Sequence, residues 1–282
     1  NKKNPPTNDT SHKKSLMRSI HEIKRQFNSH LPRHWQEAWL LFILQKPFNF
    51  LISNDDYVLS HDEYRQYIKG IEKMTQGTPF AYLTGTTDFW SLSFKVNEHT
   101  LIPRADTELL VEKVLSHITE HKITTGTLLD LGTGSGCIAI SLAKELPTWH
   151  ITATDRCPNA LRTAQHNATL NGTPNITFIQ SDWFTTLPAT AFDVIVSNPP
   201  YIAKDDSHLP ALHAEPITAL VADNNGLSDI AHIISHSRQF LADNALLAIE
   251  HGYQQGEMAR QLFSDNGFYN ILTYQDLSLI HI

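Results

Sequence analysis

Asn198, Pro199, Pro200 and Tyr201 directly follow an apolar run over residues 192–196. Two successive prolines have fixed φ angles and no amide hydrogen, so this segment is stiff and rich in acceptors. The Asn198 side-chain oxygen and the Pro199 carbonyl can each accept one hydrogen from the same planar NH2 group, on which Tyr201 can stack. Holding both hydrogens orients the nitrogen lone pair, so the segment predicts chemistry at an amide or exocyclic amine nitrogen. A proline-rich turn without a function is the alternative.

A second candidate segment is rich in glycine and follows a predicted strand over residues 127–131. It consists of Gly132, Thr133, Gly134, Ser135 and Gly136. Glycines allow a tight turn and a close approach of a ligand to the backbone. A dinucleotide site, G-x-G-x-x-G, would need a third glycine at position 137, which is Cys137. The spacing G-x-G-x-G is typical of loops that bind S-adenosyl-L-methionine, and an ordinary glycine-rich turn is the alternative.

Polar and aromatic side chains at two further strand ends extend this candidate cofactor site. Asp155 closes a predicted strand over residues 150–154, where a carboxylate can accept hydrogen bonds from both ribose hydroxyls. Asp182 and Trp183 follow a predicted strand over residues 176–180, where they can bind the adenine amine and the purine face. The carboxyl ends of parallel strands meet at one edge of a sheet. We therefore expect S-adenosyl-L-methionine as methyl donor, S-adenosyl-L-homocysteine as product and no metal, because the methyl group is already activated by positive sulfur.

Strands and helices alternate from residue 127 onward, which predicts an α/β fold with a doubly wound, mainly parallel sheet. We expect strands at 127–131, 150–154, 176–180, 192–196, 245–251 and 269–274. We expect helices at 137–146, 159–171, 227–242 and 253–266. An amphipathic helix before them begins near residue 108, with Asp106 or Thr107 as its cap.

The first part of the chain has a different pattern. Residues 1–14 carry no apolar period and predict a mobile tail. The pattern over residues 15–84 predicts a small helical domain, with a capping box from Ser60 to Glu63 and with aromatic residues such as Trp35, Trp39 and Phe42 in its core. Residues 85–104 predict a β-hairpin linker, and residues 105–282 the catalytic domain.

Composition limits the classes of partner. In a chain of 282 residues, residues 1–35 hold eight Lys and Arg against two acidic residues, whereas the rest is acidic, with a formal net charge of −7 overall. An acidic body argues against nucleic acid as the substrate. The apolar runs are far shorter than the roughly 20 residues of a membrane span. Two cysteines make no disulfide scaffold, which favours the cytoplasm. We expect a monomer. His232 and His236 lack the glutamate and third ligand of a metal site.

Several segments resemble the HemK/PrmC-type protein-(glutamine N5) methyltransferases over roughly residues 35–275. The segments are 79–85, 101–104, 130–136, 181–184 and 198–202. The resemblance implies a class I methyltransferase domain with a seven-stranded sheet behind a small helical domain that docks the substrate. That family methylates the glutamine of the Gly-Gly-Gln motif in the peptide-chain release factors of translation termination. By this resemblance residues 132–136, Asp155, Trp183 and Asn198 bind the cofactor, and residues 198–201 hold the glutamine amide. Ala105 stands where the family more often has proline.

Three other functions are compatible with parts of this pattern. One is an adenine-N6 DNA or RNA methyltransferase, because the adenine of its substrate offers the same planar NH2 group to Asn198. Such an enzyme must flip the base out of a duplex and bind the phosphates. A cofactor-binding scaffold without activity is disfavoured by the intact Asn198. A dehydrogenase of the same fold class is disfavoured by the glycine spacing.

Overall fold

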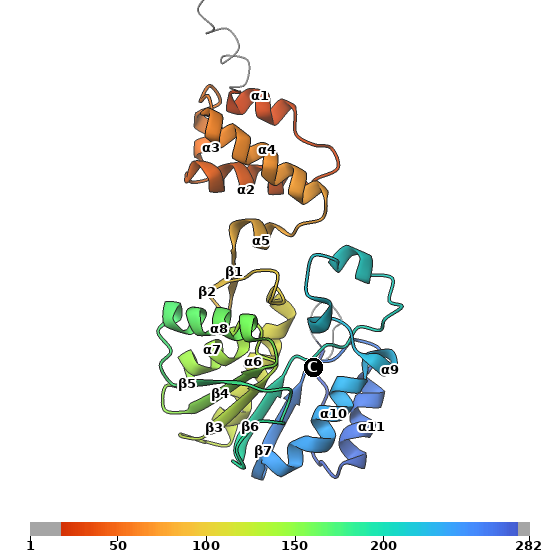
Figure 1. Ribbon diagram of the computed structural model, residues 1–282. Helices are drawn as coiled ribbons and strands as arrows, with labels where there is room; N and C mark the ends of the chain where they lie inside the picture. Colours follow the sequence, from red (N-terminus) through yellow and green to blue (C-terminus); the bar gives the residue numbers. More distant parts are fainter. Residues whose placement is uncertain (1–17, 276–282) are drawn as a thin grey trace, which may run out of the picture. The chain divides into compact units, whose positions relative to one another are not determined.

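The computed structural model describes residues 18–275 (Figure 1). The chain divides after Thr84 into two compact units, which are described here one at a time. The predicted tail over residues 1–14 lies outside the described residues, as do residues 276–282. Between residues 18 and 275 no helix combines the length and the apolar character that spanning a bilayer requires.

Helices make up the described part of the first unit. They are α1 (Ile20–Arg25), α2 (Arg33–Leu44), α3 (Phe50–Ser53), α4 (His61–Thr75) and α5 (Phe80–Thr84). The predicted capping box is confirmed, since Glu63 N donates to Ser60 Oγ at 3.3 Å and Ser60 N donates to Glu63 Oε2 at 2.7 Å. These two bonds satisfy backbone donors at the start of α4 that have no partner inside the helix.

Close contact between α2 and α4 forms the centre of the first unit's core. Trp39 and Tyr67 are buried, and Trp39 Nε1 donates to the Tyr67 carbonyl at 3.1 Å. Gly70 permits this approach, because a Cβ there would lie 2.1 Å from Trp39 Nε1. The prediction of a core position is wrong for Trp35 and Phe42, which are 41% and 38% exposed. Their positions on α2 place them at the edge of its buried face.

The second unit begins with an antiparallel hairpin of β1 (Thr86–Phe89) and β2 (Leu92–Lys95). Residues 85–104, which were expected to form a linker, belong to this unit, because Phe89 and Phe94 pack into its core. Five strands then form a parallel sheet in the order β5-β4-β3-β6-β7. They are β3 (Thr127–Leu131), β4 (His150–Asp155), β5 (Ile176–Gln180), β6 (Phe192–Ser197) and β7 (Leu241–Ile249).

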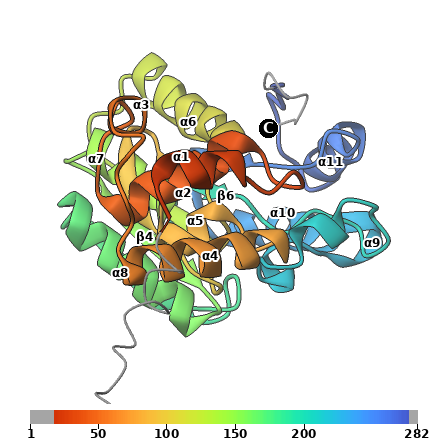
Figure 2. The same ribbon diagram turned by 90° about the horizontal axis from the view of Figure 1, so that it is seen from above.

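Helices cover both faces of this sheet, which confirms the predicted α/β, doubly wound fold (Figures 1 and 2). One face carries α6 (Glu108–Glu120), α7 (Cys137–Glu145) and α8 (Pro158–Asn171), and the other carries α10 (Ser228–Ser237) and α11 (Gly256–Asp265), after the short α9 (Asp223–Gly226). Side chains alternate along β3, so that Leu128 packs on the first face and Leu129 and Leu131 on the second. The strand order reverses between β3 and β6, the point where open α/β sheets bind ligands.

Two predicted features of this unit differ from the structure. The expected strand over residues 269–274 is not formed, and the described sheet has five strands in place of the expected seven. Tyr269 and Leu272 are each 69% exposed, so the apolar pattern of that segment is not buried. Thr107, one of the two predicted caps, is the N-cap of α6, although its side chain makes no capping hydrogen bond. A short 3-10 turn, Ala105–Thr107, leads into α6, which puts Thr107 in a helical conformation and leaves its hydroxyl for the site described below.

Candidate active site

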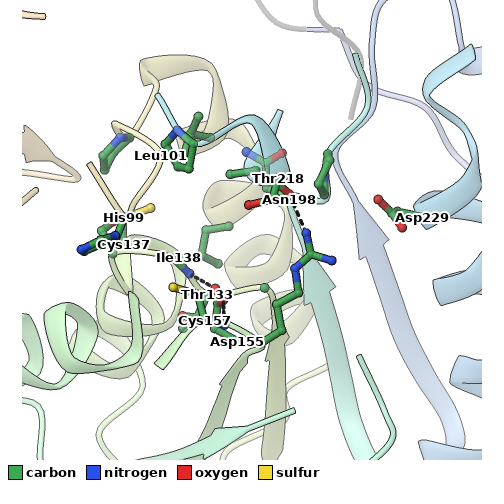
Figure 3. Close-up of a pocket in the computed structure, with 18 of the residues that line it drawn as sticks. His99, Leu101, Thr133, Cys137, Ile138, Asp155, Cys157, Asn198, Thr218 and Asp229 are labelled. Atoms are coloured by element: carbon green, nitrogen blue, oxygen red, sulfur yellow. Dashed lines mark hydrogen bonds between the residues drawn. The ribbon is translucent and has the colours of Figure 1, made fainter. Parts of the chain in front are cut away.

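A cavity of about 250 Å³ lies at the carboxyl edge of the sheet, at the reversal of strand order (Figure 3). A water molecule occupies roughly 30 Å³ of the liquid, so the cavity has room for a small organic ligand. The predicted cofactor residues that line it are Gly132, Thr133, Gly134, Ser135, Asp155, Asp182, Trp183 and Asn198. Four separate strand ends thus bring their side chains to one place, because parallel strands end at the same edge.

The glycine segment forms a tight turn between β3 and α7. Thr133 N donates to the Thr154 carbonyl at 2.7 Å, and Gly136 N donates to the Thr133 carbonyl at 2.8 Å. Gly136 is not among the lining residues. It has a φ of +84° at the start of α7, and a Cβ there would lie 2.8 Å from Ile140 Cδ1 and 3.1 Å from Ala164 Cβ. Gly136 is therefore required for packing α7 against α8, while the two glycines before it face the cavity.

A buried carboxyl group, that of Asp130, is hydrogen-bonded to the glycine segment. Asp130 is fully buried, and the Thr133 hydroxyl donates to its Oδ2 at 2.6 Å. Burial raises the pKa of Asp130 to about 7, although the Thr133 bond lowers it. The charge of Asp130 is thus sensitive to pH in the neutral range.

Asp155 joins the end of β4 to the glycine segment. Its Oδ2 accepts from Gly134 N at 2.9 Å, and its Oδ1 accepts from Cys157 N at 2.8 Å (Figure 3). Burial raises the pKa of Asp155, while the two backbone bonds act in the opposite direction. A carboxylate oxygen has two lone pairs, so each oxygen can accept one further hydrogen bond from a ligand in the cavity.

Asp182 and Trp183 form another part of the wall, at the end of β5. Trp183 has a φ of +50°, and its ring lies over Gly132, where a Cβ would be 3.5 Å from the ring. The ring therefore borders the space in front of the glycine segment. Asp182 is exposed on the same wall, and Asp229 on α10 lines the cavity as well.

Asn198 lines the cavity at the end of β6. Its backbone position is fixed by the preceding residue, because Ser197 Oγ donates to the Leu131 carbonyl at 2.8 Å and so holds β6 against β3. The Asn198 Nδ2 donates to the Thr107 hydroxyl at 3.2 Å. Since this bond uses the amide nitrogen, the orientation of the amide is set and its oxygen Oδ1 is left for another donor.

The other three residues of the proline segment are placed differently from one another. Pro200 lines the cavity, Pro199 is buried, and Tyr201 is not among the lining residues. The Tyr201 hydroxyl donates to Glu250 Oε1 at 3.1 Å, and its carbonyl accepts from Gln255 Nε2 at 2.9 Å. Burial, with the nearby Glu250, raises the pKa of Tyr201, so its hydroxyl stays protonated. Glu250 and Gln255 thus hold the segment after β6 in place.

The sequence motifs missed one wall of the cavity, which is formed by residues 98–107. His99, Leu101, Arg104 and Thr107 line it. The Arg104 guanidinium forms an ion pair with the buried Glu215, whose Oε2 also accepts from Ile102 N at 3.1 Å. Residues 101–104 were noticed in the sequence for their resemblance to a family, but no pattern in them predicts a position beside Asn198. Only the fold joins them.

The two cysteines, Cys137 and Cys157, also line the cavity. Burial, with the nearby Asp130, raises the pKa of Cys137 to about 12. The reactive form of cysteine is the thiolate, so Cys137 is not a nucleophile near neutral pH. The cavity therefore offers polar and aromatic contacts without a thiolate from Cys137.

Charge on the cavity wall fits a cationic ligand. Its two guanidinium groups belong to Arg104 and Arg156, and its carboxylates to Glu98, Asp155, Asp182 and Asp229. In the described part of the chain no group of three His, Cys, Asp or Glu residues has a geometry that could hold a metal ion. The His232 and His236 rings stack on α10 with centroids 4.2 Å apart.

Comparison with known proteins agrees with this geometry. The family model described as "Methyltransferase small domain" matches residues 105–219, and the model described as "PrmC N-terminal domain" matches residues 20–85. The chain is similar over 94% of its length to the solved structure of the hMettl16 catalytic domain in complex with MAT2A 3'UTR hairpin 6, with a TM-score of 0.55, coverage of 95% of that chain and 17% identity. At that identity the likeness shows the fold alone, a methyltransferase fold.

Two curated relatives carry the same name. The chain is 40% identical over 264 residues to the release factor glutamine methyltransferase of Aliivibrio fischeri, and the aligned residues cover 93% of this chain and 92% of the relative. It is 42% identical over 250 residues to the release factor glutamine methyltransferase of Escherichia coli, with 88% and 89% coverage. At these identities and coverages, the chain belongs to the release factor glutamine methyltransferase family.

Proposed function

We propose that this protein transfers a methyl group from S-adenosyl-L-methionine to the side-chain amide nitrogen, N5, of the glutamine in the Gly-Gly-Gln motif of peptide-chain release factors. The observation that carries the proposal is the position of Asn198, whose amide lines the cavity beside the glycine segment. Its Nδ2 is bonded to Thr107, so Oδ1 can accept a hydrogen from the substrate amide. The names of the relatives support the choice of substrate.

The residues of the cavity fit S-adenosyl-L-methionine. We assign the glycine segment and Asp155 to the polar parts of the cofactor, and Asp182 and Trp183 to its adenine. The excess of carboxylates on the wall favours a ligand that carries positive charge. When bound, the cofactor supplies a methyl group on positive sulfur, which is reactive enough to need no metal.

The proline segment positions the target nitrogen. An amide nitrogen is a poor nucleophile, because its lone pair is delocalised into the carbonyl. Asn198 Oδ1 and the Pro199 carbonyl each accept one of its hydrogens, which orients the lone pair and stabilises the positive charge that the nitrogen gains on attack. Positioning of this kind contributes about 7–11 kcal/mol in well-oriented reactions. Tyr201 does not line the cavity, so we assign it to holding the proline segment in place through its bond to Glu250.

The test measures transfer of labelled methyl groups to a purified release factor, with mass spectrometry of the product. We expect label on the glutamine of Gly-Gly-Gln. Asn198→Ala should lower kcat by about 10²–10³, while the Kd for S-adenosyl-L-methionine changes by less than about threefold, which is under 1 kcal/mol. Thr107→Val is the companion variant. It leaves Asn198 in place and removes the acceptor of its Nδ2, so it should give a smaller loss of kcat. Equal loss of cofactor binding and turnover in Asn198→Ala would contradict the role given to Asn198.

Adenine in DNA or RNA is the alternative acceptor, and it is tested in the same experiment. A nucleic acid substrate would meet carboxylates on the cavity wall and a formal net charge of −7. Adenine-containing DNA and RNA are therefore supplied as parallel acceptors. Label on nucleic acid alone would overturn the proposed substrate and would leave the fold assignment intact.

We further propose that the helical unit docks the release factor and that the enzyme acts as a monomer in the cytoplasm. Support comes from exposed apolar side chains on this unit, where Phe48 is 62% and Ile52 is 69% exposed. Exposed apolar groups of this kind mark protein contacts when they are grouped on one surface. Light scattering at the assay concentration tests the monomer. Phe48→Ser with Ile52→Ser should raise the KM for the factor and leave its kcat unchanged.

A further inference from the structure

A second, shallower hollow lies beside the candidate active site, within the second unit. Residues from the end of β2, the turn after it and α8 line this hollow: Lys95, Asn97, His99, Asn159, Arg162, Thr163 and His166. His99 lines the active-site cavity as well, so the two depressions share a wall. No acidic side chain is among the lining residues of the hollow.

The hollow carries positive charge on a chain that is acidic overall. Lys95 and Arg162 are both exposed. Among residues 18–275 neither of them forms an ion pair with a carboxylate, and Arg162 donates instead to the neutral Asn159. Glu98 Oε1 lies 3.8 Å from Nε2 of His99, the imidazole that lines both depressions. Two cations without an ion-pair partner favour an anion from outside.

Partly buried hydrogen bonds hold the hollow in shape. Asn167 is fully buried, accepts from Lys95 N at 2.7 Å and donates to the Lys95 carbonyl at 3.0 Å, which fixes the end of β2 on α8. Asn97 Nδ2 donates to Thr163 Oγ1 at 3.0 Å. The spacing of Asn159, Arg162 and His166 puts them on one face of α8. The backbones that carry the two cations are therefore joined, and a ligand need not order them.

We propose that this hollow binds an acidic side chain of the protein substrate, on the part of the substrate surface that surrounds the target glutamine. The inference rests on the proposed function, because the hollow shares His99 with the cavity that the target glutamine would enter. A carboxylate makes one compact contact, for which Lys95 and Arg162 suffice. Duplex nucleic acid presents one charge about every 1.7 Å and needs an extended basic track. The carboxylates of the neighbouring cavity interrupt such a track.

The test uses charge reversal with a matched control. The variants are Lys95→Glu, Arg162→Glu and the double variant, all on the full chain. Arg260→Glu is the control, because Arg260 is an exposed arginine on α11 whose guanidinium donates to the neutral Thr273, at 3.2 Å. The measurements are the Kd for a purified release factor, the kcat and KM for its methylation, and the same constants for a short Gly-Gly-Gln peptide without acidic residues. The Kd for S-adenosyl-L-methionine reports on folding of the second unit.

We expect Arg162→Glu to raise the Kd and the KM for the factor by about three- to tenfold, since an exposed ion pair is lost and a repulsion replaces it. The rise should shrink as salt is added, and kcat should stay within about twofold because the reacting groups are untouched. The constants for the short peptide and for the cofactor should not change. Arg260→Glu should behave as the wild type does.

Several results would overturn the inference. They are a KM that rises equally for the peptide, a rise of the same size in Arg260→Glu, and an unchanged Kd for the factor in the double variant. Loss of binding to an RNA oligonucleotide, with the Kd for the factor unchanged, would assign the hollow to nucleic acid. A wild-type protein that methylates no factor would instead refute the proposed function, and the inference with it.

Discussion

Asn167 on α8 links the glycine segment to the hairpin, and its removal gives a sharp test of the structure. Its Nδ2 donates to the Ser135 carbonyl at 2.8 Å and to the Lys95 carbonyl at 3.0 Å, while its Oδ1 accepts from Lys95 N at 2.7 Å. The side chain is fully buried. We expect Asn167→Ala to destabilise the protein and to weaken cofactor binding, because Ser135 belongs to the cofactor segment.

The magnitude follows from the environment of the three groups that lose this partner. The Ser135 bond is buried, and an unsatisfied buried group costs about 1–3 kcal/mol. The two Lys95 bonds are only partly buried, so water replaces them at a smaller cost, which gives a total of roughly 2–4 kcal/mol. For a unit of this size that corresponds to a loss of about 4–16 °C in Tm. Asn167→Asp should cost more, because it directs an anionic oxygen at two carbonyls.

Asn171 is the matched control, one turn later on α8. Its Nδ2 donates to the Ser93 carbonyl of the same hairpin at 3.0 Å, but this bond is exposed. Asn171→Ala should cost less than about 1 kcal/mol. The assay is thermal and denaturant unfolding without ligand, followed by titration with S-adenosyl-L-methionine. The reasoning is refuted if Asn167→Ala unfolds at the same temperature as Asn171→Ala and binds the cofactor as the wild type does.

Three further predictions concern the same unit. Gly136→Ala should lower the free energy of unfolding by at least about 1–3 kcal/mol because of its φ of +84°, and by more because the new Cβ would contact Ile140. Gly134→Ala should cost only the backbone strain, because nothing lies within 4 Å of a Cβ there. Denaturant unfolding without ligand compares the two variants. The pKa of Asp130 is raised from 3.8 to about 7, so between pH 3.8 and pH 7 the folded protein binds one more proton than the unfolded protein. The protonated Asp130 therefore stabilises the fold fully below pH 3.8, and this stabilisation is lost as the pH rises toward 7. Asp130→Asn should remove a slope of up to about 1.4 kcal/mol per pH unit, which unfolding of both proteins across pH 4–7 would detect; parallel pH profiles would contradict it. Tyr201→Phe should lower the free energy of unfolding by roughly 1–3 kcal/mol, since the buried Glu250 loses a donor. The Kd for the cofactor should stay unchanged in a binding titration. Weaker cofactor binding would show that the hydroxyl has another role.

The elements of the sheet were largely predictable from the sequence. The strands over residues 127–131 and 176–180 have the predicted bounds, since short apolar runs bounded by turn residues give a local signal. The last predicted strand is not formed, because its local signal is not matched by burial. Residues 269–274 have strand-like composition, but Tyr269 and Leu272 are exposed, and only burial against a neighbour converts such a pattern into a strand. The start of α6 at Glu108 and its N-cap Thr107 agree with the prediction, but the 3-10 turn before them was not predicted.

The candidate cofactor site was predicted in part. Glycine spacing, Asp155, Asp182 and Trp183 each follow a strand, and the rule that parallel strands end at one edge is enough to join them. The Asn198 segment was found by the same rule. The partner of its amide, Thr107, lies 91 residues earlier, where the sequence suggested only a helix cap. Nothing in local sequence reports such a contact.

The sequence alone determined the class of fold, and it predicts the methyl donor and the kind of nitrogen that Asn198 would hold, because these depend on local spacing, on proline and glycine geometry and on the order of strands. Only the tertiary structure decided which residues complete the site. Thr107 orients Asn198, Glu250 fixes Tyr201, and Asn167 ties the glycine segment to Lys95. The physical reason is that a hydrogen bond depends on distance and direction in space, and chain folding brings these pairs together across 32 to 91 residues of sequence.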